Sequence, residues 1–134
     1  MWQVLFLMCM SMVLGGSEGA CAAQGRWYKT GQVWNQYFST SRRDGYYMRC
    51  LTNGKWRADA CIVNSAAVKP NQEGTNERSI IMRCERYNWY TLNQRAVGCV
   101  ARDASSGGLI RINLGTCYGK CCCRPNGQNA YLTC

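Results

Sequence analysis

The stretch Cys50–Cys61, CLTNGKWRADAC, combines a short hairpin signal with a cysteine at each end. Asn-Gly is the strongest short-range hairpin signal, because a type I′ turn needs positive φ at both central residues. The same frame, Cys, two residues, Asn-Gly, six residues, Cys, returns at Cys123–Cys134 as CRPNGQNAYLTC. A frame that occurs twice in a chain of 134 residues indicates an organising unit of the fold.

The two cysteines of the first frame are too far apart to bond across a straight hairpin. If the Asn-Gly pair forms the turn, Cys50 lies opposite Arg57, and Cys61 follows four residues further along the strand. At about 3.3 Å per residue this offset is roughly 13 Å, beyond the Cα separation that a disulfide tolerates. Either residues 58–60 fold back, or each cysteine bonds elsewhere, for example one of them to Cys21.

Further similarities extend the frame to three imperfect repeats of roughly 35 to 40 residues. Met-Arg-Cys occurs at residues 48–50 and 82–84, and in both places a tryptophan and then a cysteine follow. The interval from Cys61 to Cys84 is 23 positions and that from Cys99 to Cys123 is 24 positions. Each interval contains a similar lead-in, VKPNQEG in the first and LIRINLG in the second. Residues Lys120–Cys123 replace the apolar strand of the earlier copies, so disulfides should hold the third repeat more than packing does.

Strand signals dominate the chain after residue 20. Three short segments are rich in β-branched, aromatic or apolar residues and are bounded by Gly, Asn or Ser. They are Tyr46–Leu51, Ser79–Cys84 and Leu109–Leu114. No segment shows an apolar stripe with a helical period. We therefore expect a mainly β fold of small, disulfide-rich antiparallel hairpin modules.

The first nineteen residues have the pattern of a secretory signal peptide. Val4–Leu14 is an apolar run too short to span a bilayer comfortably, and small residues follow it. Cleavage after Gly19 removes Cys9 and leaves ten of the eleven cysteines, whereas cleavage after Ala22 leaves nine. The even count favours Gly19. We expect a secreted protein, without a transmembrane anchor because no second long apolar run follows.

Ten cysteines in so short a secreted chain predict five disulfides. Their pairing does not follow from the sequence. The cluster around residues 117–123 offers four thiols to a metal, but adjacent cysteines suit a closed tetrahedral zinc site badly, so we expect no metal or cofactor. The disulfide cysteines are Cys21, Cys50, Cys61, Cys84, Cys99, Cys117, Cys121, Cys122, Cys123 and Cys134.

The chain is strongly basic, with 16 Lys plus Arg against 7 Asp plus Glu and a formal net charge of +9. Such a charge favours acidic partners, and for a secreted protein these are a sulfated polysaccharide or an acidic extracellular protein rather than nucleic acid. The alternative is a dispersed solvating charge. The expected contact residues are the basic pair and the cations that flank the first hairpin, Arg42, Arg43, Arg49, Lys55 and Arg57.

Catalysis has little support in the sequence. The chain contains no histidine, which removes the commonest general base and the commonest metal ligand. The six carboxylates after residue 19 show no spacing that suggests an acid and base pair. The aromatic residues offer either a carbohydrate-stacking platform or a core, and we expect core. They are Trp27, Tyr28, Trp34, Tyr37, Phe38, Trp56 and Trp89.

The segment GRWYKTGQVWNQYFSTSRRDGYYMRCLTNGKWRADACIV resembles the fibronectin type I-like domain of the abnormal cell migration protein 18-like family. The likeness consists of a cysteine before a Trp-Gly-Trp-like opening, an aromatic-x-Arg-Cys strand, a short turn, a tryptophan and a cysteine. These features are Cys21, residues 28–31, Trp34, residues 47–50, Asn53-Gly54, Trp56 and Cys61. The resemblance implies a small antiparallel β-module of secreted, matrix-associated proteins that act in adhesion or cell migration, with no catalytic residues.

Together these features predict a signal peptide at 1–19, a fibronectin type I-like module with two hairpin repeats at 20–101 and a partial third cysteine-rich repeat at 102–134. The expected function is that of a secreted, non-enzymatic matrix or adhesion-type binding module with an Arg-rich surface. The alternative function is that of a cationic host-defence peptide or toxin acting on membranes, which needs apolar residues exposed beside the positive charge.

Overall fold

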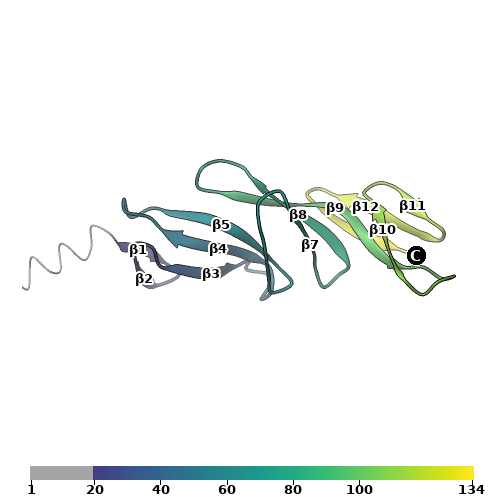
Figure 1. Ribbon diagram of the computed structural model, residues 1–134, viewed down its shortest axis with the longest axis horizontal. Coiled ribbons are helices and arrows are strands. Elements are labelled where there is room, and N and C mark those ends of the chain that lie inside the picture. The colour runs from purple at the N-terminus through teal and green to yellow at the C-terminus, as the bar shows by residue number, and fades with distance from the viewer. Residues whose placement is uncertain (1–19) are drawn as a thin grey trace, which may run out of the picture.

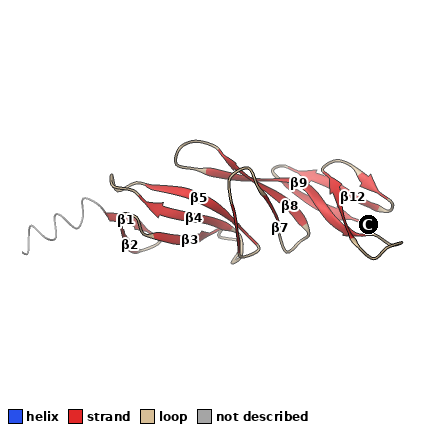
Figure 2. Ribbon diagram, in the orientation of Figure 1, coloured by secondary structure: helices blue, strands red, loops and turns tan. Residues whose placement is uncertain are grey.

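A computed structural model describes residues 20–134, and the expected signal peptide at 1–19 lies outside the described residues. The described chain forms strands and loops and contains no helix (Figure 2). This confirms the expected mainly β, disulfide-rich fold. The strands are β1 (Ala20–Ala23), β2 (Arg26–Lys29), β3 (Val33–Tyr37), β4 (Gly45–Cys50), β5 (Trp56–Val63), β6 (Ala66–Val68), β7 (Glu73–Thr75), β8 (Ile80–Arg86), β9 (Leu92–Arg102), β10 (Leu109–Asn113), β11 (Cys117–Tyr118), β12 (Cys121–Asn126) and β13 (Asn129–Thr133).

The strands form four small antiparallel sheets that follow one another along an elongated molecule (Figure 1). Their orders are β1-β2, β3-β4-β5-β6, β10-β9-β8-β7 and β11-β12-β13. The three strand segments expected from the sequence correspond to β4, β8 and β10. Strands β9 and β10 pair with each other on either side of residues 103–108, so one sheet extends across the boundary that the sequence suggested near residue 101.

The sheets resolve into three copies of one unit, a two-stranded hairpin followed by a three-stranded meander. The hairpins are β1-β2, β5-β6 and β9-β10, and the meanders are β3-β4-β5, β7-β8-β9 and β11-β12-β13. Strand β5 pairs with β4 over most of its length and with β6 at Cys61–Val63. Strands β5 and β9 thus each end one repeat and begin the next, which joins the repeats without a linker.

Each repeat contains the same buried disulfide, from the first strand of its hairpin to the middle strand of its meander. The six sulfurs belong to the least exposed residues of the described chain. Cys50 therefore bonds to Cys21, one of the alternatives that the sequence left open, and not to Cys61. The three bonds are Cys21–Cys50, Cys61–Cys84 and Cys99–Cys123, with Cα–Cα separations of 5.7, 5.9 and 5.6 Å.

A repeated turn places each meander against its middle strand. The third residue of the turn has positive φ, and its N–H donates to the carbonyl oxygen of the middle-strand cysteine. The two lead-ins recognised in the sequence contain this turn in the second and third repeats. The turn residues are Gly31, Asn71 and Gly115, which donate to Cys50, Cys84 and Cys123 at 2.8, 2.7 and 2.8 Å.

The expected type I′ turn at Asn53-Gly54 is wrong. Of the two residues only Gly54 has positive φ, 77°, and the N–H of Leu51 donates to the carbonyl oxygen of Lys55 at 2.8 Å. The loop therefore has three residues, a type in which a single glycine occupies the left-handed position. Cys50 consequently lies opposite Trp56 rather than Arg57.

The second copy of the frame makes a different turn. Asn126 pairs with Asn129, so the loop consists of the two residues Gly127 and Gln128. Gly127 has φ of 63° at the first loop position, where a type II′ turn requires glycine. The two frames share cysteine spacing and not hairpin geometry.

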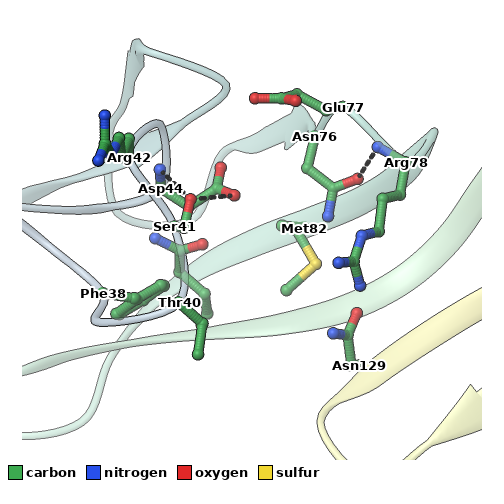
Figure 3. A pocket seen from close by; sticks show the side chains of 11 residues that line it. Phe38, Thr40, Ser41, Arg42, Asp44, Asn76, Glu77, Arg78, Met82 and Asn129 are labelled. Carbon is green, nitrogen blue, oxygen red and sulfur yellow. Dashed lines mark hydrogen bonds between the residues drawn. The ribbon is translucent and has the colours of Figure 1, made fainter.

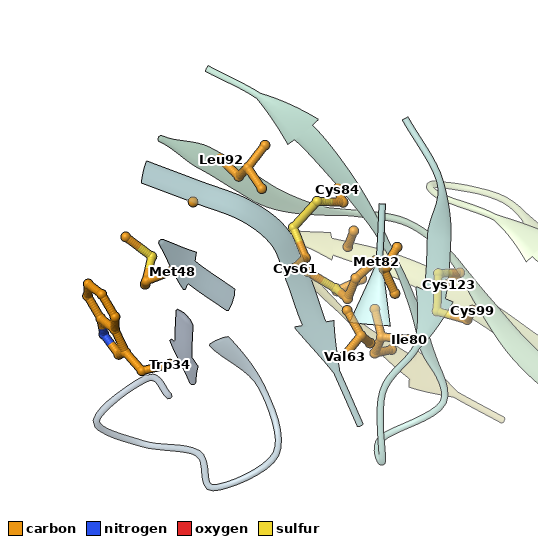
Figure 4. Close-up of a cluster of buried hydrophobic side chains, with 14 of the residues drawn as sticks. Trp34, Met48, Cys61, Val63, Ile80, Met82, Cys84, Leu92, Cys99 and Cys123 are labelled. Atoms are coloured by element: carbon orange, nitrogen blue, oxygen red, sulfur yellow. A yellow bond between two sulfur atoms is a disulfide. The ribbon is translucent and has the colours of Figure 1, made fainter. Parts of the chain in front are cut away.

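One connected cluster of buried side chains runs through all three repeats. It extends from Trp34 and Met48 in the first repeat, through Ile80 in the second, to Cys123 and Ala130 in the third. All three repeat disulfides lie inside this cluster, and Figure 4 shows Cys61–Cys84 and Cys99–Cys123. A core of this kind is narrow everywhere, which is the setting in which small domains depend on covalent bonds.

Backbone hydrogen bonds attach each repeat to the one before it. The buried Ala58 of β5 donates its N–H to the carbonyl oxygen of Tyr90 in the β8–β9 loop at 2.8 Å. The buried Ala96 of β9 makes the equivalent bond to Gln128 in the β12–β13 loop at 2.8 Å. Each alanine lies at the register shift of its own strand pair, Ala58 in β4-β5 and Ala96 in β8-β9. The meander loop of each following repeat thus rests on the last strand of its predecessor.

The third repeat carries two additional disulfides. Cys117 of β11 bonds to Cys122, its direct partner across the sheet, and Cys121 bonds to Cys134. Because alternate residues of a strand face opposite sides, the run of three cysteines ties β12 in both directions. Three of the five disulfides therefore involve the β11-β12-β13 sheet, which agrees with the expectation that sulfur holds this repeat.

Candidate functional site

The structure divides the five expected contact residues into two groups at opposite ends of β4. Arg49 of β4 and Arg57 of β5 are cross-strand partners, and Lys55 lies beside them in the connecting loop. Arg42 and Arg43 lie in the β3–β4 loop, before the other end of β4. The five residues therefore belong to two separate surfaces.

Three of the five arginine and lysine side chains are neutralised by carboxylates. Asp59 pairs with Arg49 at 2.6 Å and with Arg57 at 3.6 Å. Arg43 pairs with Glu77 of the second repeat at 3.0 Å. Exposed pairs of this kind contribute little stability individually, and the Arg57–Asp59 pair is the longest of the three.

Every carboxylate of residues 20–134 is engaged within the protein. Four accept arginines, namely Asp59, Glu73, Glu77 and Glu85. The other two cap loops: Asp44 accepts Ser41 Oγ and the N–H of Asn64, and Asp103 accepts Ser105 and Ser106. Hydrogen bonds from Ser105 and Ser106 hold the pKa of Asp103 below its ordinary value. With 16 cations against these six carboxylates, a positive surplus of ten remains for solvent and partners.

Two of the cations lie against aromatic rings. Together with these rings and Trp56 they form what we call the basic aromatic surface: Lys55, Trp56, Arg57, Trp89 and Tyr90. Arg57 Cζ lies 4.1 Å from the centroid of the Trp89 ring, and Lys55 Nζ lies 5.3 Å from that of Tyr90. Such contacts are cation–π interactions. An open hollow of about 290 Å³ lies beside the Lys55–Tyr90 contact, lined by Gly54, Lys55, Trp56 and Tyr90.

Backbone contacts hold the Trp89-Tyr90 loop in place. Arg57 Nε donates to the carbonyl oxygen of Trp89 at 2.7 Å. Arg86 donates to the carbonyl oxygens of Trp89 and Ala58 at 3.1 and 2.8 Å, and so links the loop to β5. Burial and the nearby charge of Arg57 lower the pKa of Arg86. The surface is thus built by two repeats together.

The aromatic residues do not all belong to the core. Trp34 is 6% exposed and stacks on Tyr28 with ring centroids 4.1 Å apart, so the core prediction is confirmed for Trp34. It is wrong for Trp27 and Trp89, which are 71% and 64% exposed. Trp56 packs edge-on against Trp34, at 6.3 Å, with its other side open. It therefore connects the core to the basic aromatic surface.

Sequence reasoning missed Arg86 and Tyr90. Arg86 follows the repeated Met-Arg-Cys strand and Tyr90 follows the repeated tryptophan, but their role depends on contact with β5, about thirty positions away. The only sequence signal is the repeat itself, which places the loop of the second copy at the same point as the Asn53-Gly54 loop of the first.

The described residues contain no group of three His, Cys, Asp or Glu side chains that could hold a metal ion. Within residues 20–134 there is also no helix able to cross a membrane. Comparisons of the chain with known protein families, with curated proteins and with solved structures found no match.

Proposed function

We propose that this chain is a secreted, non-enzymatic binding protein of the extracellular matrix or adhesion type, whose basic aromatic surface binds a sulfated polysaccharide. The observation that carries the proposal is the position of Arg57 beside the exposed ring of Trp89 and of Lys55 beside the half-buried ring of Tyr90. Secretion rests on the apolar leader and is compatible with five disulfides.

The chemistry of the surface suits a sulfated sugar chain. Indole and phenol rings offer flat apolar faces on which sugar rings pack, with polar edges for hydroxyl groups. Guanidinium and ammonium groups form charge-assisted hydrogen bonds to sulfate oxygens. Because the carboxylates of residues 20–134 are all engaged internally, the surplus charge draws a polyanion toward the protein.

The resemblance to fibronectin type I-like modules supplies the rest of the proposal, namely association with matrix and a role in supporting cell migration. Three repeats joined end to end through shared strands support it, because they form an elongated rod in which no linker separates the repeats. A rod of this kind suits a protein that displays a binding surface rather than one that encloses a substrate.

A heparin column tests the proposal. We expect Lys55→Gln/Arg57→Gln to elute at lower salt than the unmodified protein, and Lys69→Gln/Lys120→Gln to elute close to it. The control variant removes the same charge from two exposed lysines outside the basic aromatic surface. Equal shifts in elution for both variants would show that net charge alone drives retention. If the protein binds an acidic protein but is not retained on heparin, the acidic protein replaces the polysaccharide as the proposed partner.

A second candidate function, membrane disruption by a cationic host-defence protein, is favoured by one observation. Trp27 and Trp89 are large and exposed; Trp27 follows Arg26 in the sequence and Trp89 lies against Arg57. Apolar groups beside positive charge are what interfacial binding needs. Release of dye from anionic vesicles at concentrations where heparin binding saturates would favour this function. Intact vesicles under those conditions would favour the polysaccharide.

A further inference from the structure

A polar groove of about 600 Å³ lies where all three repeats meet. Its walls come from the β3–β4 loop of the first repeat, the β7–β8 loop of the second and the start of β13 in the third (Figure 3). Met82 and the buried Gln94 lie on strands β8 and β9 beneath it. The groove is separate from the basic aromatic surface and shares no residue with it.

The loops that form the walls are held in place by internal bonds. Ser41 Oγ accepts the N–H groups of Arg43 and Asp44 at 3.1 and 3.0 Å. Arg43 in turn pairs with Glu77 on the opposite loop at 3.0 Å. The groove is therefore preformed, as ligand sites usually are, and its volume falls in the range of such sites.

One wall presents hydrogen-bond donors. Asn76 Oδ1 accepts the N–H groups of Arg78 and Ile80, both at 3.0 Å, which leaves its Nδ2 as a donor. Asn129 Oδ1 accepts the N–H of Ala130 at 2.9 Å, with the same result. Figure 3 shows the Arg78 guanidinium extending into the space between these two amides. No carboxylate of residues 20–134 pairs with Arg78, so this wall suits an anion.

The remaining lining suits hydroxyl groups and a ring. Both hydrogens of Gln94 Nε2 are used, by the carbonyl oxygens of Gly45 at 2.8 Å and Ile62 at 3.2 Å, which leaves Oε1 as an acceptor in a residue that is 9% exposed. Phe38 lies across the groove from Arg78 with part of its ring open (Figure 3). Apart from Phe38 and Met82 the lining is polar.

We infer that this groove binds an acidic saccharide unit. The carboxylate or sulfate of the sugar accepts hydrogen bonds from Arg78, Asn76 and Asn129, a hydroxyl donates to Gln94 Oε1, and the ring packs on Phe38. Arg42 adds a second cation to the lining. The two lining carboxylates are engaged internally, Glu77 by Arg43 and Asp44 by Ser41 and Asn64. An acidic peptide fits less well, because peptide recognition relies on apolar anchors in pockets, and the groove offers few apolar side chains.

Titration of the folded, oxidised protein tests this site. Three sugars are compared: a sulfated, uronate-containing disaccharide, its desulfated form and a neutral disaccharide. Two-dimensional NMR should show shifts of the Gln94 and Asn129 side-chain amides with both acidic sugars. A response to the sulfated sugar alone assigns the site to sulfate, and an equal response to both assigns it to the carboxylate. Shifts with the neutral disaccharide as large as these, or none with any sugar, would overturn the inference.

Substitution separates this site from the proposed heparin surface. Arg78→Gln should weaken disaccharide binding by about tenfold or more, since it removes a charged hydrogen-bond donor, while Lys120→Gln should leave it unchanged. Lys55→Gln/Arg57→Gln should also leave it unchanged while it reduces heparin retention. The inference fails if Lys120→Gln weakens binding as much as Arg78→Gln, or if a glutamate-rich peptide competes better than the acidic disaccharide.

Discussion

Arg57 lies over the ring of Trp89, with Cζ 4.1 Å from the ring centroid, and its Nε donates to the Trp89 carbonyl oxygen at 2.7 Å. The two residues belong to different repeats, Arg57 to β5 and Trp89 to the β8–β9 loop. The contact therefore builds the binding surface and joins the repeats at the same time. Loss of packing between the first two repeats would also remove the surface.

A double-mutant cycle measures this contact. We expect Arg57→Gln and Trp89→Leu to lower the free energy of unfolding in urea, with a coupling free energy of about 0.5 to 1 kcal/mol, the range for a largely exposed cation–π pair. Trp89 is 64% exposed, so a larger value is not expected. Purely additive effects of the two substitutions would show that the ring contact contributes nothing.

The five disulfides should differ in their reaction with a mild reductant. Cys117 and Cys134 are exposed, so the pairs Cys117–Cys122 and Cys121–Cys134 should open first in the folded protein. The three repeat disulfides are almost completely buried and should open only when the fold opens. Alkylation after partial reduction, followed by peptide mass spectrometry, gives the order. Early labelling of Cys61 or Cys84 would contradict it.

The repeated turn makes a prediction about its third residue. Asn71 has φ of 69° at the place where Gly31 and Gly115 have 86° and 77°. Gly115→Asn should therefore be tolerated, whereas Gly115→Ala should lower the free energy of unfolding by about 1 kcal/mol, because a Cβ is disfavoured at left-handed φ. Nothing lies within 4 Å of a Cβ at this position, so thermal unfolding of the two variants compares backbone conformation alone.

The sequence predicts the architecture of this chain because repetition and cysteine spacing are local patterns. The mainly β fold, the disulfides and the third repeat's dependence on sulfur all follow from them. The Asn53-Gly54 turn type does not, because loops of two and three residues both accept Asn-Gly, and the pairing of Cys50 with Trp56 decides which forms.

The candidate site is harder to predict because charge pairing is spatial. Arg49 and Arg43 look free in the sequence, but Asp59 and Glu77 neutralise them across strands and between repeats. Arg78 lies in no basic cluster of the sequence, and its place in the groove depends on the third repeat's Asn129. Contacts of this kind come from the packing of repeats, which the sequence of one repeat does not specify.

The Asp103 loop should open in acid. Hydrogen bonds from the backbone N–H and hydroxyl of Ser105 and from the hydroxyl of Ser106 favour the charged carboxylate, so the pKa of Asp103 in the folded protein is lowered from its ordinary value. A group with a depressed folded pKa contributes stability above its unfolded pKa, and this contribution is lost as the pH falls through the folded pKa. The loop should therefore be closed at neutral pH and loosen only below the ordinary aspartate value of about 4.

Carboxyl-carbon NMR of Asp103 and amide exchange at Ser105 follow this transition. We expect the carboxyl midpoint to lie below that of a model peptide, and exchange at Ser105 to rise as the carboxyl group protonates. The matched variant Asp103→Asn keeps one acceptor oxygen and cannot titrate, so its loop should exchange at a rate set only by the chemistry of the amide over the same pH range. A normal midpoint for Asp103, or an identical exchange profile in the variant, would show that the two serines do not hold the carboxylate.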